Sequence, residues 1–458
     1  MNKKGLSLFA LTMIAIGSTI GSGIFKTPTS IAQAVPDPMW MTVLWIAGGV
    51  VSMIGALVYA EMGGRFPKGG GIYTYLKESF GPLPAFLYGW CLLTVVSSGT
   101  IAALIVVFAD YSQKIVGFSD QLIPVVAASS IVILTLFNMF SLDSSKWFAN
   151  VSTVLKIIGI YGLLILLLFL GTNNIFDNSI SVSEIFTSEK AQGFGWAKAF
   201  VGVLWSYTGW HYASFVTNEA ENPKRNVPLA LILGTLVVTL SYVLVSIGYM
   251  NVLSIEEIQN SKTLAADAME KIIPGGSFAV SILIALSVFG CAGLYVLATP
   301  RIIQQMSNEG LFFEAFGKSH PKFGVPVNAI LLQSAWAIVL IFVWGKFEAL
   351  YTYVTITEWF FLALACSGIF VFRIKKMGQT DGIFKSPLYP VLPVLFIAVV
   401  AWFIVKNALS DDPAAYYGLL VIPLGAVVHF VMKTLKRIDV LEKLTQEQQV
   451  LIEKLLEK

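Results

Sequence analysis

The stretch STIGSGIF, residues 18–25, interrupts the first long apolar run of a 458-residue chain. It places two glycines and three hydroxyl side chains within eight residues, a composition that weakens an α-helix. A later apolar run, residues 196–219, is interrupted in a similar way by WSYTGW, residues 205–210. The two interruptions predict two broken helices, and they decide how the rest of the chain is interpreted.

Apolar runs recur from one end of the chain to the other. The chain is 56% hydrophobic and only 12% charged, whereas a soluble domain carries about 25% charged residues. A helix that spans a membrane needs about 20 mostly apolar residues. The sequence therefore predicts an all-α polytopic membrane protein with twelve transmembrane helices. Their approximate ranges are 6–33, 39–61, 84–109, 121–141, 148–170, 196–219, 227–250, 275–299, 326–344, 349–372, 388–408 and 415–433.

The distribution of basic residues predicts the orientation. Lys and Arg are more frequent in the loops that share a side with the two termini, and cytoplasmic loops carry this excess. We therefore expect a multi-pass protein of the cell (inner) membrane with both termini in the cytoplasm. The membrane domain is expected to cover residues 1–437. In residues 438–458, leucines recur at near-helical spacing among Glu, Gln and Lys, which predicts an amphipathic cytoplasmic helix.

The remaining composition argues against other classes of protein. The three cysteines lie inside predicted spans and the three histidines are scattered, with no metal-binding or nucleotide-binding motif around them. These residues are Cys91, Cys291, Cys366, His211, His320 and His429. A net charge of +3 reflects the cytoplasmic loops and tail, so it does not indicate nucleic-acid binding. We expect no metal, no cofactor, no nucleic-acid partner and no enzymatic activity.

Two broken helices in corresponding halves of a membrane protein are typical of an inverted-repeat transporter, because freed backbone groups can exist in a membrane only where they line a cavity. N–H groups at a helix N-terminus attract a carboxylate, and carbonyl groups at a C-terminus attract an ammonium. A zwitterionic amino acid satisfies both ends. The alternative is that the small residues only allow close helix packing.

Five motifs, in chain order, carry a family resemblance. They are GSGIF (21–25), the stretch from YAE (59–61) through FPKGGG (66–71) to FGP (80–82), the segment from GW (209–210) to Glu219 and NP (222–223), Arg301 with NEG (308–310), and PLYP (387–390). Together they resemble the amino acid–polyamine–organocation superfamily, and most closely its L-type amino acid transporter branch. The resemblance implies a LeuT-type fold with a five-plus-five inverted repeat, in which the repeats cover about 6–170 and 196–372. The last two helices, about 388–433, lie outside the repeats.

The resemblance also implies where the substrate binds. The implied positions are Thr19, Ile20, Gly21, Ser22, Gly23, Ile24, Trp205, Ser206, Tyr207 and Thr208. The backbone N–H groups of Ser22 and Gly23 would hold the carboxylate, and the carbonyls of Thr19, Trp205 and Thr208 would hold the ammonium. The branch usually has Phe in place of Trp205 and Gly in place of Thr208. Bulkier residues leave less room, which favours small to medium neutral substrates.

Lys156 lies about 12 Å into the span 148–170, at about 1.5 Å per helical residue. A charge at that depth is a functional candidate, and the alternative is a lysine that only pairs with carbonyls. In the family resemblance, this lysine replaces the sodium ion of sodium-coupled relatives, which implies sodium-independent transport. We expect its ammonium to reach Ile20 or Gly21 and to lie near Ser287.

Glu358 is a second charged residue near the middle of a predicted span, 349–372. Three roles are open: it lines the pocket, it carries a proton, or it sits protonated in a structural hydrogen bond. Lys26, in the outer half of the first span, is expected to snorkel to the outer surface. The candidate coupling or gating residues are Lys156, Ser287, Trp205 and Glu358.

The function favoured by these features is sodium-independent exchange of small to medium neutral L-amino acids by alternating access. The alternatives are a proton-coupled amino acid symporter and an antiporter of cationic amino acids or polyamines. The partners are then the amino acid and the lipid bilayer. In the animal L-type transporters, a cysteine in the loop after the third helix links a glycoprotein. Residues 110–120 contain no cysteine, so no disulfide-linked subunit is expected.

Overall fold

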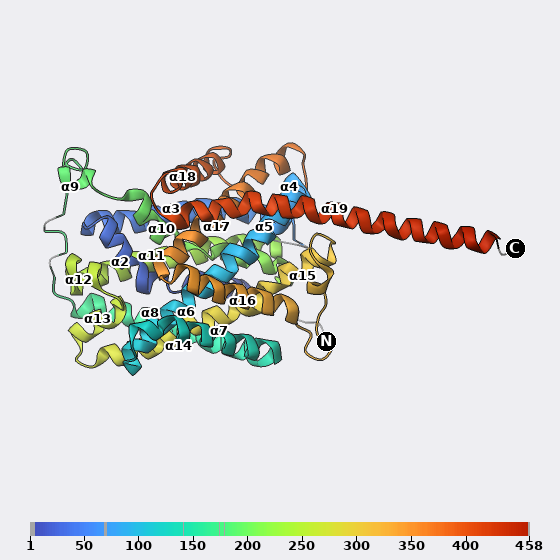
Figure 1. Cartoon of the computed structure of the whole chain (residues 1–458). Helices are drawn as coiled ribbons and strands as arrows, with labels where there is room; N and C mark the ends of the chain where they lie inside the picture. Colours follow the sequence, from blue (N-terminus) through green and yellow to red (C-terminus); the bar gives the residue numbers. More distant parts are fainter. Residues whose placement is uncertain (1–4, 68–70, 141, 174, 178, 457–458) are drawn as a thin grey trace.

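The computed structural model describes residues 5–456 apart from 68–70, 141, 174 and 178, and it describes only the backbone of 140, 142–153, 215, 218 and 435–456. In this part of the chain the elements are helical, and one isolated parallel bridge joins Leu6 to Ala220. The helices pack into one bundle, from which the last helix projects (Figure 1). They are α1 (Leu8–Thr19), α2 (Gly23–Ala34), α3 (Pro38–Arg65), α4 (Ile72–Phe80), α5 (Pro82–Cys91), η1 (Leu92–Ser97), α6 (Ser98–Val116), η2 (Asp120–Leu122), α7 (Ile123–Phe140), α8 (Leu142–Leu170), α9 (Glu189–Gln192), α10 (Trp196–Tyr207), η3 (Trp210–Glu219), α11 (Pro223–Val252), α12 (Ile255–Asn260), α13 (Leu264–Ile272), α14 (Gly276–Ala298), α15 (Pro300–Asn308), η4 (Glu314–Phe316), α16 (Val327–Trp344), α17 (Phe347–Ile374), α18 (Val391–Ala408) and α19 (Pro413–Leu456).

The predicted all-α polytopic architecture is confirmed. Nine helical segments of the described residues are long and apolar enough to cross a membrane, and the pair α1 and α2, bent by 43°, makes a tenth. The other two predicted spans correspond to α8 and to the broken pair α10 and η3. Length and apolar composition thus support nine or ten spans, and the predicted number of twelve is not established by this criterion.

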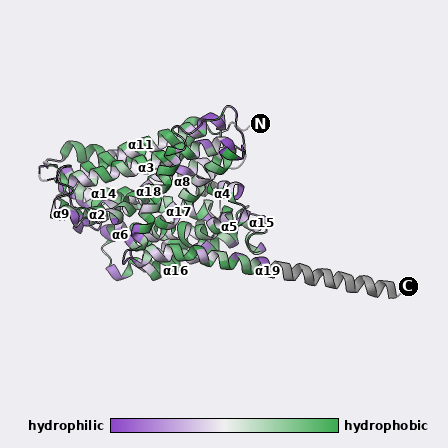
Figure 2. Ribbon diagram, turned by 90° about the horizontal axis from the view of Figure 1, so that it is seen from above, coloured by the Kyte–Doolittle hydropathy of each residue, from purple (hydrophilic) through white to green (hydrophobic). Residues whose placement is uncertain are grey.

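The outer surface of the bundle is apolar along the helices. Phe169, Leu240 and Phe342 are 81%, 56% and 61% exposed. Burying apolar area is worth about 25 cal/mol per Å² in water, so such a surface is stable when lipid covers it. Figure 2 shows hydrophobic residues along the helices and hydrophilic ones gathered in the loops. The chain is therefore an integral membrane protein.

Both predicted helix breaks are present, and they touch one another. Helix α1 ends at Thr19 and α2 begins at Gly23, while α10 ends at Tyr207 and η3 begins after Gly209. Gly209 has a φ of 125°, a conformation that residues with a Cβ rarely adopt. A Cβ on Gly209 would also lie 2.4 Å from the carbonyl oxygen of Ser18. The Ser18 hydroxyl donates to the Gly209 carbonyl at 2.9 Å, which joins the two breaks directly.

Two elements differ from the predicted helices. The predicted span 84–109 contains the π-helix η1 between α5 and α6, and such wide turns often occur at functional sites. The last predicted span continues into residues 438–456 of the tail as one uninterrupted helix, α19. The side chains of 438–458 lie outside the described residues, so the amphipathic face stays a prediction.

A buried cluster of charges lies at the C-terminal end of α3. The Glu61 carboxylate is fully buried and accepts hydrogen bonds from Arg65 at 2.9 and 3.0 Å. It also accepts from Arg373 of α17 and from the backbone N–H of Ser386. Buried ions of opposite charge with several hydrogen bonds hold each other in place. The cluster thus joins α3, α17 and the segment before α18.

Lys26 does not snorkel to the surface, so that expectation is wrong. Its ammonium donates to Asp110 at 2.8 Å and to the Lys262 carbonyl at 2.7 Å, and its side chain is 8% exposed. The physical reason is that α6 brings a carboxylate to the ammonium inside the protein. A paired lysine has no need to reach water.

Candidate functional site

A small pocket lies where the two helix breaks meet. Its cavity volume is about 30 Å³. The wall is formed by both breaks together with parts of α6 and α14. The lining residues are Ser18, Thr19, Gly21, Ser22, Gly23, Thr100, Leu104, Trp205, Ser206, Thr208, Cys291 and Tyr295. None of these side chains is charged at neutral pH, so the backbone ends of the broken helices supply the main polarity.

The N-terminus of α2 points its backbone donors at the pocket. The first N–H groups of any helix have no partner within the helix. Ser22 is the N-cap residue, and its side chain makes no capping hydrogen bond. The buried Ser22 hydroxyl has no hydrogen-bond partner among the described residues. This end of α2 can therefore bind an anion such as a carboxylate.

The C-terminal ends of α1 and α10 bring carbonyl groups to the same pocket. The Thr19 carbonyl accepts from the Tyr242 hydroxyl at 3.0 Å, and a carbonyl can accept a second hydrogen bond. The Thr208 hydroxyl accepts from the Trp359 indole N–H at 3.0 Å. The latter contact fixes the position of the chain just after α10. Two helix C-termini carry partial negative charge, which favours a cation between them.

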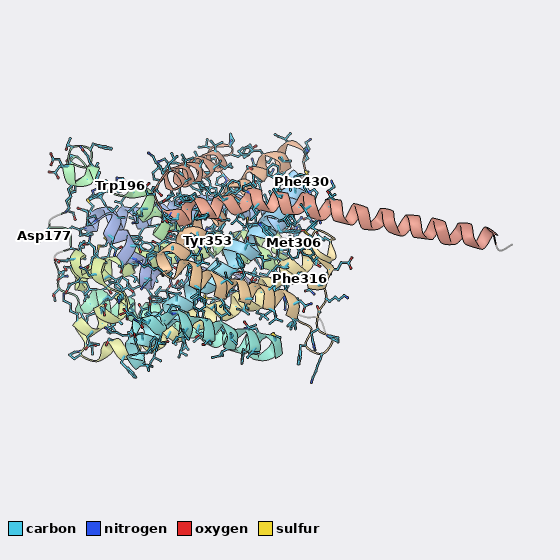
Figure 3. The ribbon with its side chains drawn as sticks, viewed as in Figure 1. Asp177, Trp196, Met306, Phe316, Tyr353 and Phe430 are labelled. Atoms are coloured by element: carbon cyan, nitrogen blue, oxygen red, sulfur yellow. The ribbon has the colours of Figure 1, made fainter. Side chains whose placement is uncertain are left out.

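Aromatic rings separate the pocket from a wider cavity. The Trp205 ring lies 6.1 Å, between centroids, from the rings of Phe347 and Tyr351. Tyr351 also lines the wider cavity, which has a volume of about 830 Å³ and lies near the starts of α10 and α17. Trp196, at this end, and Met306, at the opposite end, are marked in Figure 3. Trp205 therefore stands between the pocket and one end of the bundle.

Lys156 of α8 reaches the back of the pocket. Its ammonium donates to the Gly17 carbonyl at 2.8 Å and lies 3.2 Å from the Cys291 sulfur. The side chain is buried, with 1% exposure. The carbonyl contact is thus one turn earlier on α1 than the expected Ile20 or Gly21. Ser287 lies one turn before Cys291 on α14 and is also buried.

Glu358 does not line the pocket. The structure therefore does not support the first of its three open roles, that of a pocket-lining residue. Its Oε1 atom lies 3.5 Å from Nε2 of His211 in η3, and the two side chains are 3% and 0% exposed. His211 was not among the predicted site residues. Its position two residues after Gly209 was the available signal, because that places it at the start of the second half of a broken helix.

Comparisons with known proteins identify the family of this chain. Residues 6–428 match the family described as amino acid permease. The chain belongs to the amino acid permease family. The permease is therefore a transporter and not an enzyme, and its resemblance to the L-type branch of the superfamily is confirmed.

Three relatives of the permease cover most of its length. The b(0,+)-type amino acid transporter 1 of Mus musculus is 30% identical over 437 residues, which are 93% of this chain and 88% of the relative. The cystine/glutamate transporter of Homo sapiens is 28% identical, with 93% and 85% covered. The serine/threonine exchanger SteT of Bacillus subtilis is 28% identical, with 94% and 96% covered. These relatives support amino acid exchange as the general activity of the permease.

The pocket of the permease contains part of the predicted set. The predicted residues that line it are Thr19, Gly21, Ser22, Gly23, Trp205, Ser206 and Thr208. Ile20, Ile24 and Tyr207 do not line it, and the Tyr207 hydroxyl instead donates to the Trp45 carbonyl at 2.9 Å. The opposite wall was missed. It consists of Thr100, Leu104, Cys291 and Tyr295, and these residues belong to apolar helices with no local signal in the sequence. In the described residues there is no cluster that could hold a metal ion.

Proposed function

We propose that the permease exchanges small to medium neutral L-amino acids, without sodium, across the cell (inner) membrane. The observation that carries this proposal is the pairing of opposite helix ends at one pocket. The N-terminus of α2 offers N–H groups to a carboxylate, and the C-termini of α1 and α10 offer carbonyls to an ammonium. An amino acid fits this arrangement, because it carries both a carboxylate and an ammonium group.

The side-chain end of the substrate meets an apolar and uncharged wall. Leu104, Cys291 and Tyr295 form it together with Trp205. A cationic side chain needs a carboxylate, and the lining residues include none. The relatives include a serine/threonine exchanger and a cystine/glutamate transporter. The bulk of Trp205 favours the smaller of these for the permease.

Alternating access then requires gates at both ends of the pocket. Trp205 with Phe347 and Tyr351 is the proposed outer gate. The charge cluster around Glu61 is part of the proposed inner closure. The orientation follows from the excess of basic residues in the loops that share a side with the termini.

The purified permease alone, in proteoliposomes loaded with serine, is expected to exchange external radiolabelled serine. The three cysteines are buried, so none is exposed to link a second subunit by a disulfide. Competition by each of the twenty amino acids would define the substrate class. Replacing sodium with potassium at constant ionic strength should leave the rate unchanged. A requirement for sodium or for a second subunit would contradict the proposal, and strong competition by arginine alone would favour the cationic alternative.

Trp205→Phe is expected to widen the pocket and to shift the preference between leucine and serine. A pocket discriminates a few methylene groups by about 1–3 kcal/mol, so the ratio of the two apparent affinities should move toward leucine by about tenfold. Phe347→Leu is the control, because Phe347 contacts the Trp205 ring but does not line the pocket. If the ratio of the apparent affinities for leucine and serine is unchanged in Trp205→Phe, Trp205 does not determine the substrate preference.

A further inference from the structure

A second buried polar site lies behind the pocket wall. Glu358 of α17 and His211 of η3 place a carboxyl oxygen and an imidazole nitrogen 3.5 Å apart, with side-chain exposures of 3% and 0%. Neither residue lines the pocket. The proposed contacts with an amino acid therefore give this pair no role.

Among the described residues, the titratable groups that face Glu358 come from four helices and are phenols. They are Tyr59 of α3, Tyr88 of α5, Tyr212 of η3 and Tyr295 of α14. The His211 ring lies 4.5 Å from the Tyr212 ring and 6.5 Å from the Tyr59 ring, between centroids. Phenols of ordinary acidity are neutral at about pH 7. The charge of the site is therefore set by Glu358 and His211.

One proton makes this pair neutral as a whole. On Glu358 the proton leaves two neutral groups, and on His211 it creates an ion pair. Without the proton, the carboxylate is a single anion buried at the depth of the membrane. An uncompensated buried charge costs at least about 3 kcal/mol. The pair in its closed, buried form therefore holds one proton.

The pair is connected to the substrate pocket through the second helix break. Thr208 lines the pocket, and His211 follows it by three residues across the turn at Gly209. On the other side, Trp359 donates its indole N–H to Thr208 at 3.0 Å and directly follows Glu358. A movement at Thr208 that opens or closes the pocket thus displaces both His211 and Glu358.

We propose that His211 and Glu358 form a proton-binding site, and that the bound proton crosses the membrane together with the amino acid. This inference rests on the proposed function and adds a second transported species to it. Binding of the amino acid closes the pocket and favours the form in which His211 and Glu358 hold one proton between them. Coupling between two ligands is reciprocal, so amino acid binding takes up a proton whenever the pair is empty. The pair empties as the pH rises.

Proton uptake can be measured on the whole purified permease by calorimetric titration with serine. Titrations in two buffers of different ionisation enthalpy, at several values between about pH 6 and about pH 9, give the number of protons taken up per serine. In the wild type this number should rise toward one at the alkaline end. Glu358→Gln mimics the protonated acid permanently and should remove at least about nine tenths of the uptake.

Glu348→Gln is the matched control, because Glu348 belongs to the same helix but lines the wide cavity. It should take up the same number of protons as the wild type. The protons bound by serine itself are calculated from the ionisation of serine at each pH and are subtracted for every variant. His211→Asn should move the pH range of uptake by at least about one unit, and it decides the matter if Glu358→Gln does not fold. Serine binding without proton uptake, or undiminished uptake in Glu358→Gln, overturns the inference. Absence of serine binding in the wild type would instead refute the proposed function, and the inference with it.

Discussion

Gly23→Ala is expected to lower amino acid exchange by about a hundredfold while leaving the protein in the membrane. A Cβ on Gly23 would lie 2.4 Å from the Ser206 hydroxyl and 2.7 Å from the Ser206 Cα and Cβ atoms. A backbone atom cannot move aside as a flexible side chain does. The added methyl must therefore push α2 away from α10, at a cost of about 1–3 kcal/mol. A cost of about 3 kcal/mol corresponds to an exchange rate about a hundredfold lower.

The displacement affects the N-terminus of α2, which is proposed to bind the substrate carboxylate. Gly23 is the first residue of α2, so its movement shifts the N–H groups that are proposed to hold the carboxylate. Exchange in proteoliposomes measures the effect, and size-exclusion chromatography of the purified variant measures folding. Near-normal exchange by well-folded Gly23→Ala would show that the substrate carboxylate does not bind at this end of α2.

Gly21→Ala is the matched control at the same break. The sequence alone predicts that valine at residue 21 is as harmful as valine at residue 23. The structure distinguishes the two positions, because a Cβ on Gly21 would meet no atom closer than Leu104 Cδ2 at 3.9 Å. That is an ordinary van der Waals distance. Gly21→Ala should therefore retain exchange within about threefold of the wild type.

The features that could be predicted from the sequence are those with a local cause. The helix breaks follow from glycines and hydroxyl residues within short apolar runs, so residues 18–25 and 205–210 could be located without a structure. Lys156 is conspicuous because a charge inside a long apolar run is rare. The all-α polytopic architecture follows from hydropathy. Each of these inferences depends on residues that are close together in the chain.

The features that were missed depend on residues that are far apart in the chain. Glu358 and His211 are separated by more than half of the second repeat, and no periodicity connects them. Lys26 was misjudged because Asp110, its partner on α6, lies 84 residues away. Tyr295 and Thr100 line the pocket from mostly apolar stretches of α14 and α6 that show no break in the sequence. Only helix packing brings such residues together.

Lys156→Met is expected to lower exchange by at least about tenfold, with a much smaller change in the apparent affinity for the amino acid. The ammonium of Lys156 joins α8 to the Gly17 carbonyl of α1 and to Cys291 of α14. It therefore holds the first half of the broken helix against two other helices. Lys156 does not line the pocket, so its loss affects movement between states more than substrate contact.

The choice of methionine separates charge from packing. Methionine keeps most of the length and apolar volume of lysine but cannot donate to a carbonyl. The Gly17 carbonyl would then lose a charge-assisted hydrogen bond, worth about 1.5–3 kcal/mol. Lys156→Ala removes the volume as well and should be at least as impaired. If the lysine only fills space, the methionine variant exchanges serine at a near-normal rate. If its charge replaces a bound sodium ion, that variant is crippled, and sodium leaves the wild type unaffected because the ammonium already occupies the position between α1, α8 and α14.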